Sequence, residues 1–564
     1  MELSERIRSL LTELYPGTAD DLHQHLMVRL QQVNVPQPTH GDYFSERTLT
    51  LITYGDSIQQ EGQPPIQSLH HFLRQQLGDL IDTVHILPFY PYSSDDGFSV
   101  KDYYAVNPAL GNWQDIRNMS EDYRMMFDAV INHMSAQSEW FAAFLREEEE
   151  FRNLFMTAHP ETDLSAVTRP RTSPLLTPFE MASGQIRHVW TTFSADQVDF
   201  DFRQPSTLFR ILDVLLFYIE QGAQVIRLDA IAFLWKQAGT TSLHLPETHG
   251  VIKLIRAALD VVAPHVYLIS ETNVPHQENI SYFGTNGDEA QLVYNFTLPP
   301  LLLHTLIDGH AHKLADWINS LPPSTARTTF FNFTASHDGI GVRPVEGILS
   351  PDELLRLFNH VQQVGGRISY RSQPDGSQTA YELNVTYVDA AGAPNIDQST
   401  HIRRFLLTQA VMLALSGIPA VYIHSLLGTR NDYAGLEALG YNRAINRAKL
   451  NADVVAKLLH ESGSFRAETF AGYVHLLQIR KSLKASHPQA QQQAWTENNG
   501  AVLCIRRISL DGLQTVTAVF NFTNVPQPYS ASESTDALTG EKLETGMSTI
   551  EAYGMRWLVE ETAQ

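Results

Sequence analysis

Cysteine is nearly absent from this chain. Cys504 is the single cysteine among 564 residues, so an intrachain disulfide is excluded and a reducing compartment is the natural environment. Its neighbours in Val502-Leu503-Cys504-Ile505 are apolar, which is typical of an unreactive core thiol. The N-terminal residues from Met1 to Arg6 lack the continuous apolar stretch of a signal peptide. We therefore expect a cytoplasmic protein.

Basic residues and long apolar runs are also scarce. The chain has 40 Lys and Arg against 62 Asp and Glu, and this net charge of -22 would repel phosphate backbones. No apolar run reaches the roughly 18 residues that a membrane-spanning helix requires. Hydrophobic residues make up 43% and charged residues 18%, which is ordinary for globular proteins. We expect a folded protein that binds neither nucleic acid nor a membrane.

Short β-type apolar runs alternate with stretches of helical periodicity, a pattern typical of repeated β-α units. One helix is predicted over residues 206–221, with Ser206 as N-cap and Gly222 as its C-terminal stop. Eight strands with helices between them predict a closed (β/α)₈ TIM barrel, an α/β fold whose functional residues follow the C-terminal ends of the strands. The predicted strands are 49–54, 84–89, 126–131, 224–229, 266–271, 292–296, 329–333 and 420–424.

The chain is too long for one hydrophobic core, because such cores stop growing at about 250 to 300 residues. Two segments after strand ends are too long for simple loops and predict loop-inserted subdomains that wall the pocket. After about residue 485 the helical pattern gives way to β-type segments around the turn Asp511-Gly512. The predicted organisation is a helical lead-in at 1–45, barrel parts at 46–133, 205–341 and 401–485, inserted subdomains at 134–204 and 342–400, and a C-terminal β domain at 486–564.

Carboxylates and histidines are dense at the predicted strand ends. A single strand-end Asp or Glu is more often a helix cap or an ion-pair partner than a catalytic group. Burying several such groups on one face of a barrel costs several kcal/mol each unless they are paired or used, so four clusters together indicate an active site. The clusters are Asp128 with Asn132-His133, Arg227 with Asp229, Glu271, and His337-Asp338.

Asp229 and Glu271 end adjacent predicted strands. Glycoside cleavage with retention needs a carboxylate nucleophile and a protonated carboxylic acid about 5 Å apart. Arg227 lies two residues before Asp229, so both side chains point to the same face of the strand and the cation would keep Asp229 ionised. This pattern predicts Asp229 as nucleophile and Glu271 as general acid/base.

In order and spacing, these clusters resemble the four signature regions of the α-amylase-type glycoside hydrolase superfamily. The resemblance implies that Asp229 forms a covalent β-glucosyl-enzyme, that Glu271 transfers the proton, and that Asp338 stabilises the oxocarbenium-like transition state. It also implies one sugar subsite lined by His133, Arg227 and His337. The matching motifs are Asp128-Ala-Val-Ile-Asn-His133, Arg227-Leu-Asp229-Ala, Glu271-Thr-Asn and Ser336-His337-Asp338.

A narrower resemblance is to the sucrose phosphorylase subgroup. It implies that Asp95 and Arg443 hold the terminal glucosyl unit, that Phe98 offers a flat apolar platform, and that inorganic phosphate releases α-glucose 1-phosphate. It implies no metal and no cofactor, and a homodimer would be ordinary for this family. The motifs are Ser94-Asp95-Asp96-Gly97-Phe98, Asn132-His133-Met134-Ser135, Glu139-Trp140-Phe141 and Tyr441-Asn442-Arg443-Ala444-Ile445-Asn446-Arg447.

We expect loops around the pocket to select the acceptor, the group that is joined to the glucosyl unit in the substrate. The proline-rich segment 168–179 holds Arg169 and Arg171, and the second insertion carries 369–376 and Tyr381-Glu382. Both loops resemble those of glucosylglycerate phosphorylases, which implies an α-glucoside and phosphate as substrates and an arginine that binds the glycerate carboxylate. The alternative is that both arginines pair with acidic neighbours.

Other functions remain open at this point. The same catalytic residues would serve a glucosylglycerol, sucrose or sucrose 6′-phosphate phosphorylase, or an α-glucoside hydrolase or transglucosidase. A catalytically inactive barrel would lack at least one of the three carboxylates, and all three are present. An unrelated barrel enzyme would have to match four motifs in order by chance.

Overall fold

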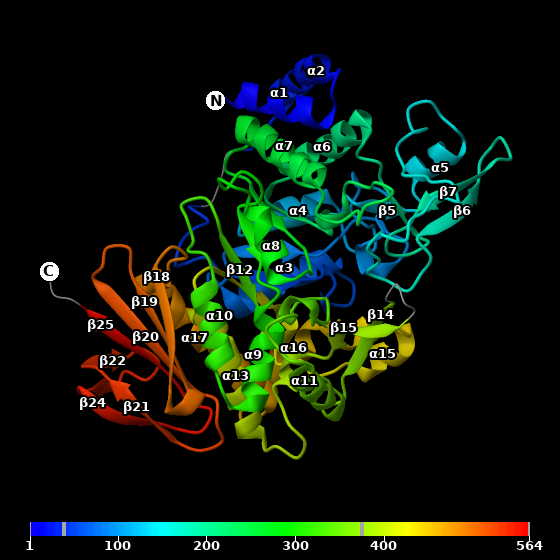
Figure 1. The fold of residues 1–564 in the computed structure, drawn as a ribbon. Helices are drawn as coiled ribbons and strands as arrows, with labels where there is room; N and C mark the ends of the chain where they lie inside the picture. Colours follow the sequence, from blue (N-terminus) through cyan, green and yellow to red (C-terminus); the bar gives the residue numbers. More distant parts are fainter. Residues whose placement is uncertain (1, 37–40, 373–376, 562–564) are drawn as a thin grey trace.

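The computed structural model describes residues 2–36, 41–372 and 377–561, and its centre is a closed barrel of parallel strands (Figure 1). Neighbours in the barrel are consecutive barrel strands along the chain, which confirms the predicted (β/α)₈ barrel. Each predicted strand overlaps one of them. They are β1 (Thr50–Thr53), β3 (Thr83–Ile86), β4 (Arg124–Ala129), β9 (Ala223–Leu228), β10 (Tyr267–Ser270), β11 (Leu292–Tyr294), β12 (Thr329–Phe333) and β16 (Ile418–Tyr422).

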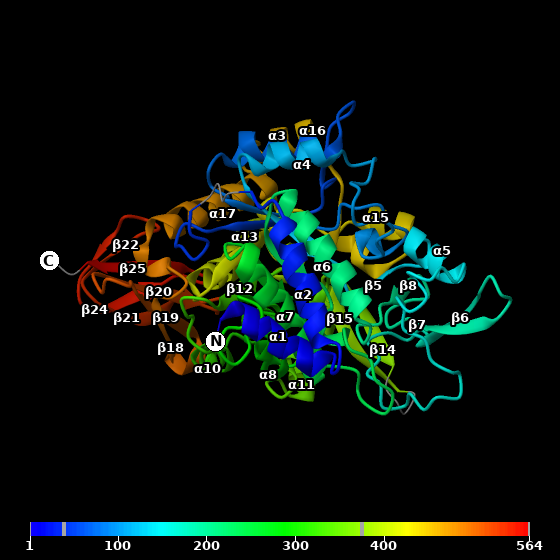
Figure 2. The same cartoon turned by 90° about the horizontal axis from the view of Figure 1, so that it is seen from above.

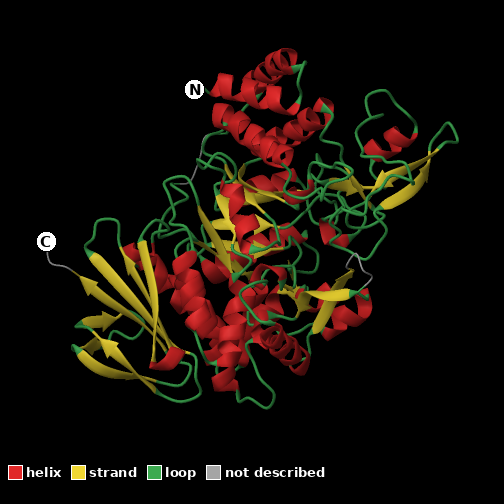
Figure 3. Cartoon of the chain, viewed as in Figure 1, coloured by secondary structure: helices red, strands yellow, loops and turns green. Residues whose placement is uncertain are grey.

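Helices surround these strands, as Figure 3 shows in red and yellow. The helix predicted at 206–221 is α6 (Pro205–Glu220), but its predicted N-cap is wrong. Gln204 is the N-cap and Pro205 takes the first turn, where its fixed φ and missing N–H cost nothing. The other helices between barrel strands and after β16 include α3 (Pro65–Leu77), α4 (Trp113–Ser120), α7 (Pro246–Val262), α8 (His276–Ile280), α9 (Leu298–Asp308), α10 (His312–Ser320), α13 (Gln398–Ala414), α16 (Ala452–Leu459) and α17 (Phe465–Ser482).

Two N-terminal helices, α1 (Leu3–Leu14) and α2 (Ala19–Gln32), lie against α7 (Figures 1 and 2). The approach is close because α7 carries Gly250, where a Cβ would stand only 3.0 Å from the Leu14 side chain. Ile7 and Leu11 are fully buried in the contact region. Along the described stretches of chain, no helix has both the length and the apolar character to span a membrane.

Two groups of small sheets follow C-terminal ends of barrel strands and reach the right of Figure 1. The first, after β4, consists of β5 (His133–Ser135) paired with β8 (Gln197–Asp199) and the hairpin β6 (Leu176–Glu180) and β7 (Ile186–Trp190). The second, after β12, consists of β13 (Ile340–Gly341), β15 (Gln378–Asn384) and β14 (Arg367–Ser372). Residues 373–376 of the predicted acceptor loop lie outside the described residues.

A C-terminal β region is present, as predicted. Its main sheet has the order β18-β19-β20-β25-β22-β23, and β19 and β20 are joined through Asp511-Gly512, where Gly512 has a φ of 70°. The strands are β18 (Gln491–Glu497), β19 (Val502–Ile508), β20 (Gln514–Asn521), β22 (Ser534–Asp536), β23 (Lys542–Leu543) and β25 (Met555–Glu561), with a separate pair β21 (Gln527–Ala531) and β24 (Gly546–Ile550).

Arg507 in β19 joins this sheet to the barrel. Its guanidinium is 3.1 Å from the carbonyl oxygen of Ala414, at the end of α13, and 2.8 Å from that of His487. It also donates to the carbonyl oxygens of Ala490 and Gln491 at 3.3 and 3.2 Å. A single buried side chain therefore satisfies carbonyl groups on both sides of the junction.

Replacing Arg507 with Met should destabilise the protein by about 2 to 4 kcal/mol, because the buried carbonyl groups lose their donor. Thermal unfolding measures the effect. Arg506→Met is the matched control, since Arg506 is exposed on the neighbouring position of the same strand and should change stability by less than about 0.5 kcal/mol. Equal unfolding curves for the two variants would contradict the assignment.

Candidate active site

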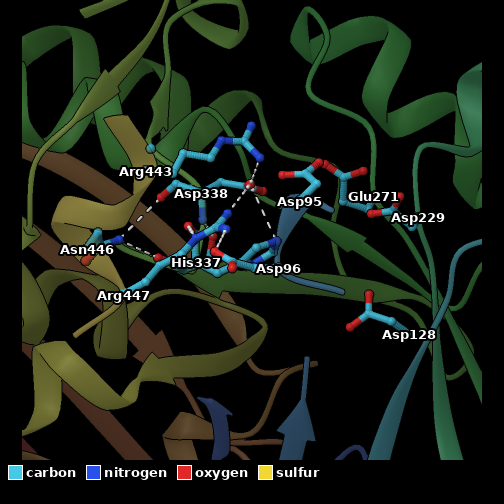
Figure 4. Close-up of polar contacts among 12 residues, drawn as sticks. Asp95, Asp96, Asp128, Asp229, Glu271, His337, Asp338, Arg443, Asn446 and Arg447 are labelled. Carbon is cyan, nitrogen blue, oxygen red and sulfur yellow. Dashed lines mark hydrogen bonds and ion pairs between the residues drawn. The ribbon is translucent and has the colours of Figure 1, made fainter. Parts of the chain in front are cut away.

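Asp229 and Glu271 follow directly on β9 and β10. These strands are in register at Leu228 and Ser270, and the Glu271 N–H donates to the Leu228 carbonyl oxygen at 3.1 Å. The Ala230 N–H donates to Glu271 Oε2 at 3.0 Å, and Ala230 has a left-handed φ of 51°, a strained conformation that often marks functional sites. Figure 4 shows the two carboxylates side by side.

Arg227 supplies the positive charge beside these two carboxyl groups. Its side chain is 2% exposed, Nη1 lies 2.7 Å from Asp229 Oδ1, and Nη2 lies 4.0 Å from Glu271 Oε1. Nη1 also bonds Asp128 Oδ1, and Asp128 Oδ2 lies 2.6 Å from His85 Nε2. Burial works to raise the pKa of Asp128, but Arg227 and His85 hold it below its usual value. The cluster is one buried cation among three carboxyl groups.

The protonation of the pair follows from burial and from these distances. Burial raises the pKa of Asp229 and of Glu271 to about 7, while Arg227 lowers both. Two adjacent carboxylates repel each other, so one proton is shared between them. Arg227 is closer to Asp229 than to Glu271, so Asp229 is the ionised member and Glu271 holds the proton.

Asp338 lies in the loop after β12, and its Oδ1 is 2.7 Å from Arg443 Nη1. Burial works to raise the pKa of Asp338, but the positive charges of Arg443 and Arg447 hold it well below its usual range. Burial lowers the pKa of His337 well below its usual value. The site therefore presents an ionised carboxylate beside a neutral imidazole.

Arg443 is itself held by Glu382 of β15. Arg443 Nε and Nη2 lie 3.1 and 3.0 Å from the two carboxylate oxygens of Glu382, a bidentate pair. Glu382 Oε1 also accepts the Gly339 N–H at 3.0 Å. The structure thus puts Glu382 behind Arg443 and next to the backbone that follows Asp338.

A strained turn presents Asp95. Asp95 and Asp96 have left-handed φ values of 53° and 47°, and Gly97 follows with a φ of 108°. A Cβ at Gly97 would stand 2.6 Å from the Pro88 carbonyl oxygen, so only glycine fits. Such strain persists where the surroundings impose it.

Arg447 supplies part of that constraint. Its Nη1 lies 2.5 Å from Asp96 Oδ2, which also accepts a hydrogen bond from the Tyr441 hydroxyl. Its Nε donates to the His337 carbonyl oxygen at 2.8 Å. Arg447 therefore ties the turn of Asp95 to the loop of Asp338 (Figure 4).

Phe98 and His133 complete the inner wall. The ring of Phe98 stacks on His337 at 4.7 Å between centroids with an interplanar angle of 5°. His133 Nε2 lies 2.9 Å from the Phe98 carbonyl oxygen and 3.2 Å from Gln197 Nε2. Burial lowers the pKa of His133, so its ring is neutral at pH 7.

Most of these groups line one cavity. The sequence-predicted residues that line it are Asp95, Phe98, His133, Arg171, Asp229, Glu271, His337, Asp338, Tyr381 and Arg443. Arg227 and Glu382 lie directly behind this lining. Arg169 is turned into its own loop, where it bonds the Ser173 carbonyl oxygen.

The two inserted segments meet at the cavity. The Arg171 guanidinium carbon lies 5.3 Å from the ring centre of Tyr381 and 5.9 Å from that of Phe193. The cavity is also lined by residues that the sequence analysis did not select: Phe193, Gln197, Asn273 and Arg343. Arg447 was quoted within a motif, but its link to Asp96 required the fold.

Within residues 2–36, 41–372 and 377–561, no group of three or more His, Cys, Asp or Glu could hold a metal ion. The arrangement offers two neighbouring carboxyl groups that share a proton and an ionised carboxylate, Asp338, in the same cavity. Such a set can displace a leaving group at one carbon and hold hydroxyl groups around it.

Comparison with known proteins agrees with this geometry. Residues 72–338 match the model of the alpha amylase catalytic domain. The chain is 46% identical to a glucosylglycerate phosphorylase of Allomeiothermus silvanus over 539 residues, which is 94% of this chain and 95% of that protein. It is 43% identical to the Escherichia coli glucosylglycerate phosphorylase, over 92% of this chain and 93% of that protein.

Among solved structures, a sucrose 6F-phosphate phosphorylase from Thermoanaerobacter thermosaccharolyticum has the same fold, with a TM-score of 0.70 and 23% identity over 88% of this chain and 98% of that one. The full-length relationships decide the classification. The chain belongs to the alpha-amylase family, in the group that includes the glucosylglycerate and sucrose phosphorylases.

Proposed function

We propose that this enzyme cleaves 2-O-α-D-glucosyl-D-glycerate with inorganic phosphate, giving α-D-glucose 1-phosphate and D-glycerate with retention. The observation that carries the proposal is the 46% identity, over 94% of the chain, to a relative named glucosylglycerate phosphorylase. The carboxylate pair with one shared proton supports the reaction class independently.

In the first step, the ionised Asp229 attacks the anomeric carbon while Glu271 donates its proton to the glycosidic oxygen. The bond from carbon 1 to the glycerate oxygen breaks, and a covalent β-glucosyl-enzyme forms at Asp229. In the second step, a phosphate oxygen attacks the same carbon, Glu271 takes the phosphate proton, and Asp229 leaves as a carboxylate. Two inversions give net retention.

The glucosyl unit would lie between Phe98 and the carboxylates. Asp95 and Arg443 bind its far hydroxyl groups, and the neutral His337 donates a hydrogen bond. The single N–H of the neutral His133 is used by the Phe98 carbonyl oxygen, so this ring serves as part of the wall. Asp338 is held ionised by Arg443 and stabilises positive charge that develops on the ring in the transition state. Glu382 acts as a positioning residue for Arg443.

Arg171 supports phosphorolysis over hydrolysis. It lines the acceptor side of the cavity, and no described carboxylate forms an ion pair with it. A guanidinium there favours an anionic acceptor such as phosphate over neutral water. A cytoplasmic location and a homodimer remain predictions from the sequence.

The first test is phosphate-dependent release of glucose 1-phosphate from a panel of donors. Glucosylglycerate should be by far the best donor, with glucosylglycerol, sucrose and sucrose 6′-phosphate as comparisons. Preference for one of these three would move the acceptor assignment to it. Free glucose formed at a rate independent of phosphate would show a hydrolase.

Asp229→Asn should lower turnover by about 10⁴-fold or more, because the amide is nearly isosteric but cannot attack the anomeric carbon. Circular dichroism and the thermal midpoint should match the unaltered enzyme, which separates lost chemistry from lost fold. Near-normal activity in the folded variant would rule out Asp229 as the nucleophile.

The pH profile tests Glu271. Its pKa is raised to about 7, so kcat/KM for glucosylglycerate should fall as pH rises above about 7 and the acid loses its proton. Glu271→Gln should keep much of the activity with α-glucosyl fluoride, whose leaving group needs no proton, and should lose most of the activity with glucosylglycerate. Equal losses with fluoride and glucosylglycerate would contradict the assignment of the acid.

A further inference from the structure

Arg343 lines the catalytic cavity on the side of the second inserted segment. It begins the short helix η4 (Arg343–Val345), directly after β13. Its side chain is 14% exposed, and its Nε is buried with no hydrogen-bond partner among the described residues. A buried, unpaired N–H of a cation costs free energy that a bound anion would recover.

The backbone around Arg343 is firmly held. The N–H of Val342 donates to the Tyr381 carbonyl oxygen at 3.2 Å, and Val345 is fully buried. The Pro344 carbonyl oxygen accepts from Thr297 Oγ1 at 3.3 Å. A side chain on a rigid backbone segment binds a ligand most selectively, because little conformational freedom is lost on binding.

Arg343 also lies on the acceptor side of Glu271. Gly341, two residues earlier, packs so closely on Asn273 that a Cβ there would stand 2.5 Å from the amide group. Asn273 follows the acid Glu271 by two residues and lines the same cavity, and its Oδ1 is buried without a hydrogen-bond partner. An acceptor that departs from Glu271 therefore meets an unpaired donor and an unpaired amide oxygen.

The only carboxylate that the described residues pair with Arg343 is Glu346, with Oε1 3.9 Å from Nε. That distance is too long for a hydrogen bond, and Glu346 is 47% exposed. Glu346 also pairs with Arg371, whose Nη2 lies 3.5 Å from the same oxygen. Arg171, in contrast, already lies near the rings of Tyr381 and Phe193.

From these contacts we infer that Arg343 is the residue that selects the acceptor by its carboxylate, with the Asn273 amide receiving an acceptor hydroxyl. This inference rests on the proposed function, and it deepens that function by separating the carboxylate site from Arg171. Arg343 binds the acceptor's charge and takes no part in the attack on the anomeric carbon.

A competition for the glucosyl-enzyme tests this role. The enzyme is charged with α-glucosyl fluoride in the absence of phosphate, and equal concentrations of glycerate and glycerol compete for the intermediate. The ratio of glucosylglycerate to glucosylglycerol depends only on the acceptor step, so effects on the donor step cancel. Arg343→Gln should lower this ratio by about 10- to 100-fold, the usual effect of losing hydrogen bonds to a charged group.

Arg367→Gln is the control, because Arg367 is exposed on β14 and does not line the cavity, and it should leave the ratio unchanged. Arg343→Lys should recover part of the preference, since it keeps the charge but lacks the planar fork. An unchanged ratio in Arg343→Gln overturns the inference, including when both products decline together. A fall in the ratio with Arg171→Gln but not with Arg343→Gln also overturns the inference.

The test also separates this inference from the function on which it rests. If the unaltered enzyme releases no glucose 1-phosphate from glucosylglycerate and does not prefer glycerate in the competition, the proposed function fails and the inference fails with it. If the unaltered enzyme prefers glycerate and Arg343→Gln keeps that preference, only the inference fails.

Discussion

The active site depends on one buried guanidinium. Arg227 is 2% exposed and contacts Asp128, Asp229 and, at 4.0 Å, Glu271. Without this cation, neighbouring buried carboxylates could not remain charged, because desolvation and mutual repulsion would protonate them. With it, the shorter contact favours ionisation of Asp229, which leaves the shared proton nearer Glu271. The same contact thus underlies the roles that we propose for the two carboxyl groups.

A second charge network holds the opposite wall of the cavity. Arg443 connects Asp338 to Glu382, and Arg447 connects Asp96 to the carbonyl group of His337. Asp96 and Arg447 are 351 positions apart in the chain, and Arg443 and Glu382 are 61 positions apart. Their side chains are mostly buried, so the network is weakly screened by salt and keeps the donor subsite rigid. Rigid polar groups around developing charge are what lowers a barrier of this kind.

Much of the barrel, and the meeting of Asp229 and Glu271 in one cavity, was predictable from local patterns. The predicted strands alternate with helices and therefore all run in the same direction. A parallel barrel brings their C-terminal ends to one face, so Asp229 and Glu271 could be selected because each directly follows a strand. In irregular segments, no comparable rule predicts from the sequence which way a side chain points. Arg169 and Arg171 differ by two residues in a proline-rich loop, yet one lines the cavity and the other bonds its own backbone. Arg343 was not selected because its place in the cavity wall and its unpaired Nε appear only in three dimensions.

Strand β15 has a consequence for how this wall of the cavity can change. Tyr381 lines the cavity, while the next residue, Glu382, is buried against Arg443. The pairing of β15 with β14 is irregular at this point, because Glu382 faces Ser369 and Ala380 faces Tyr370, which leaves Tyr381 as the extra residue of a β-bulge. Deleting this extra residue would restore regular pairing and would remove the side chain that reaches the cavity. A substitution at Tyr381 would instead keep the bulge and leave the pair of Glu382 and Arg443 in place.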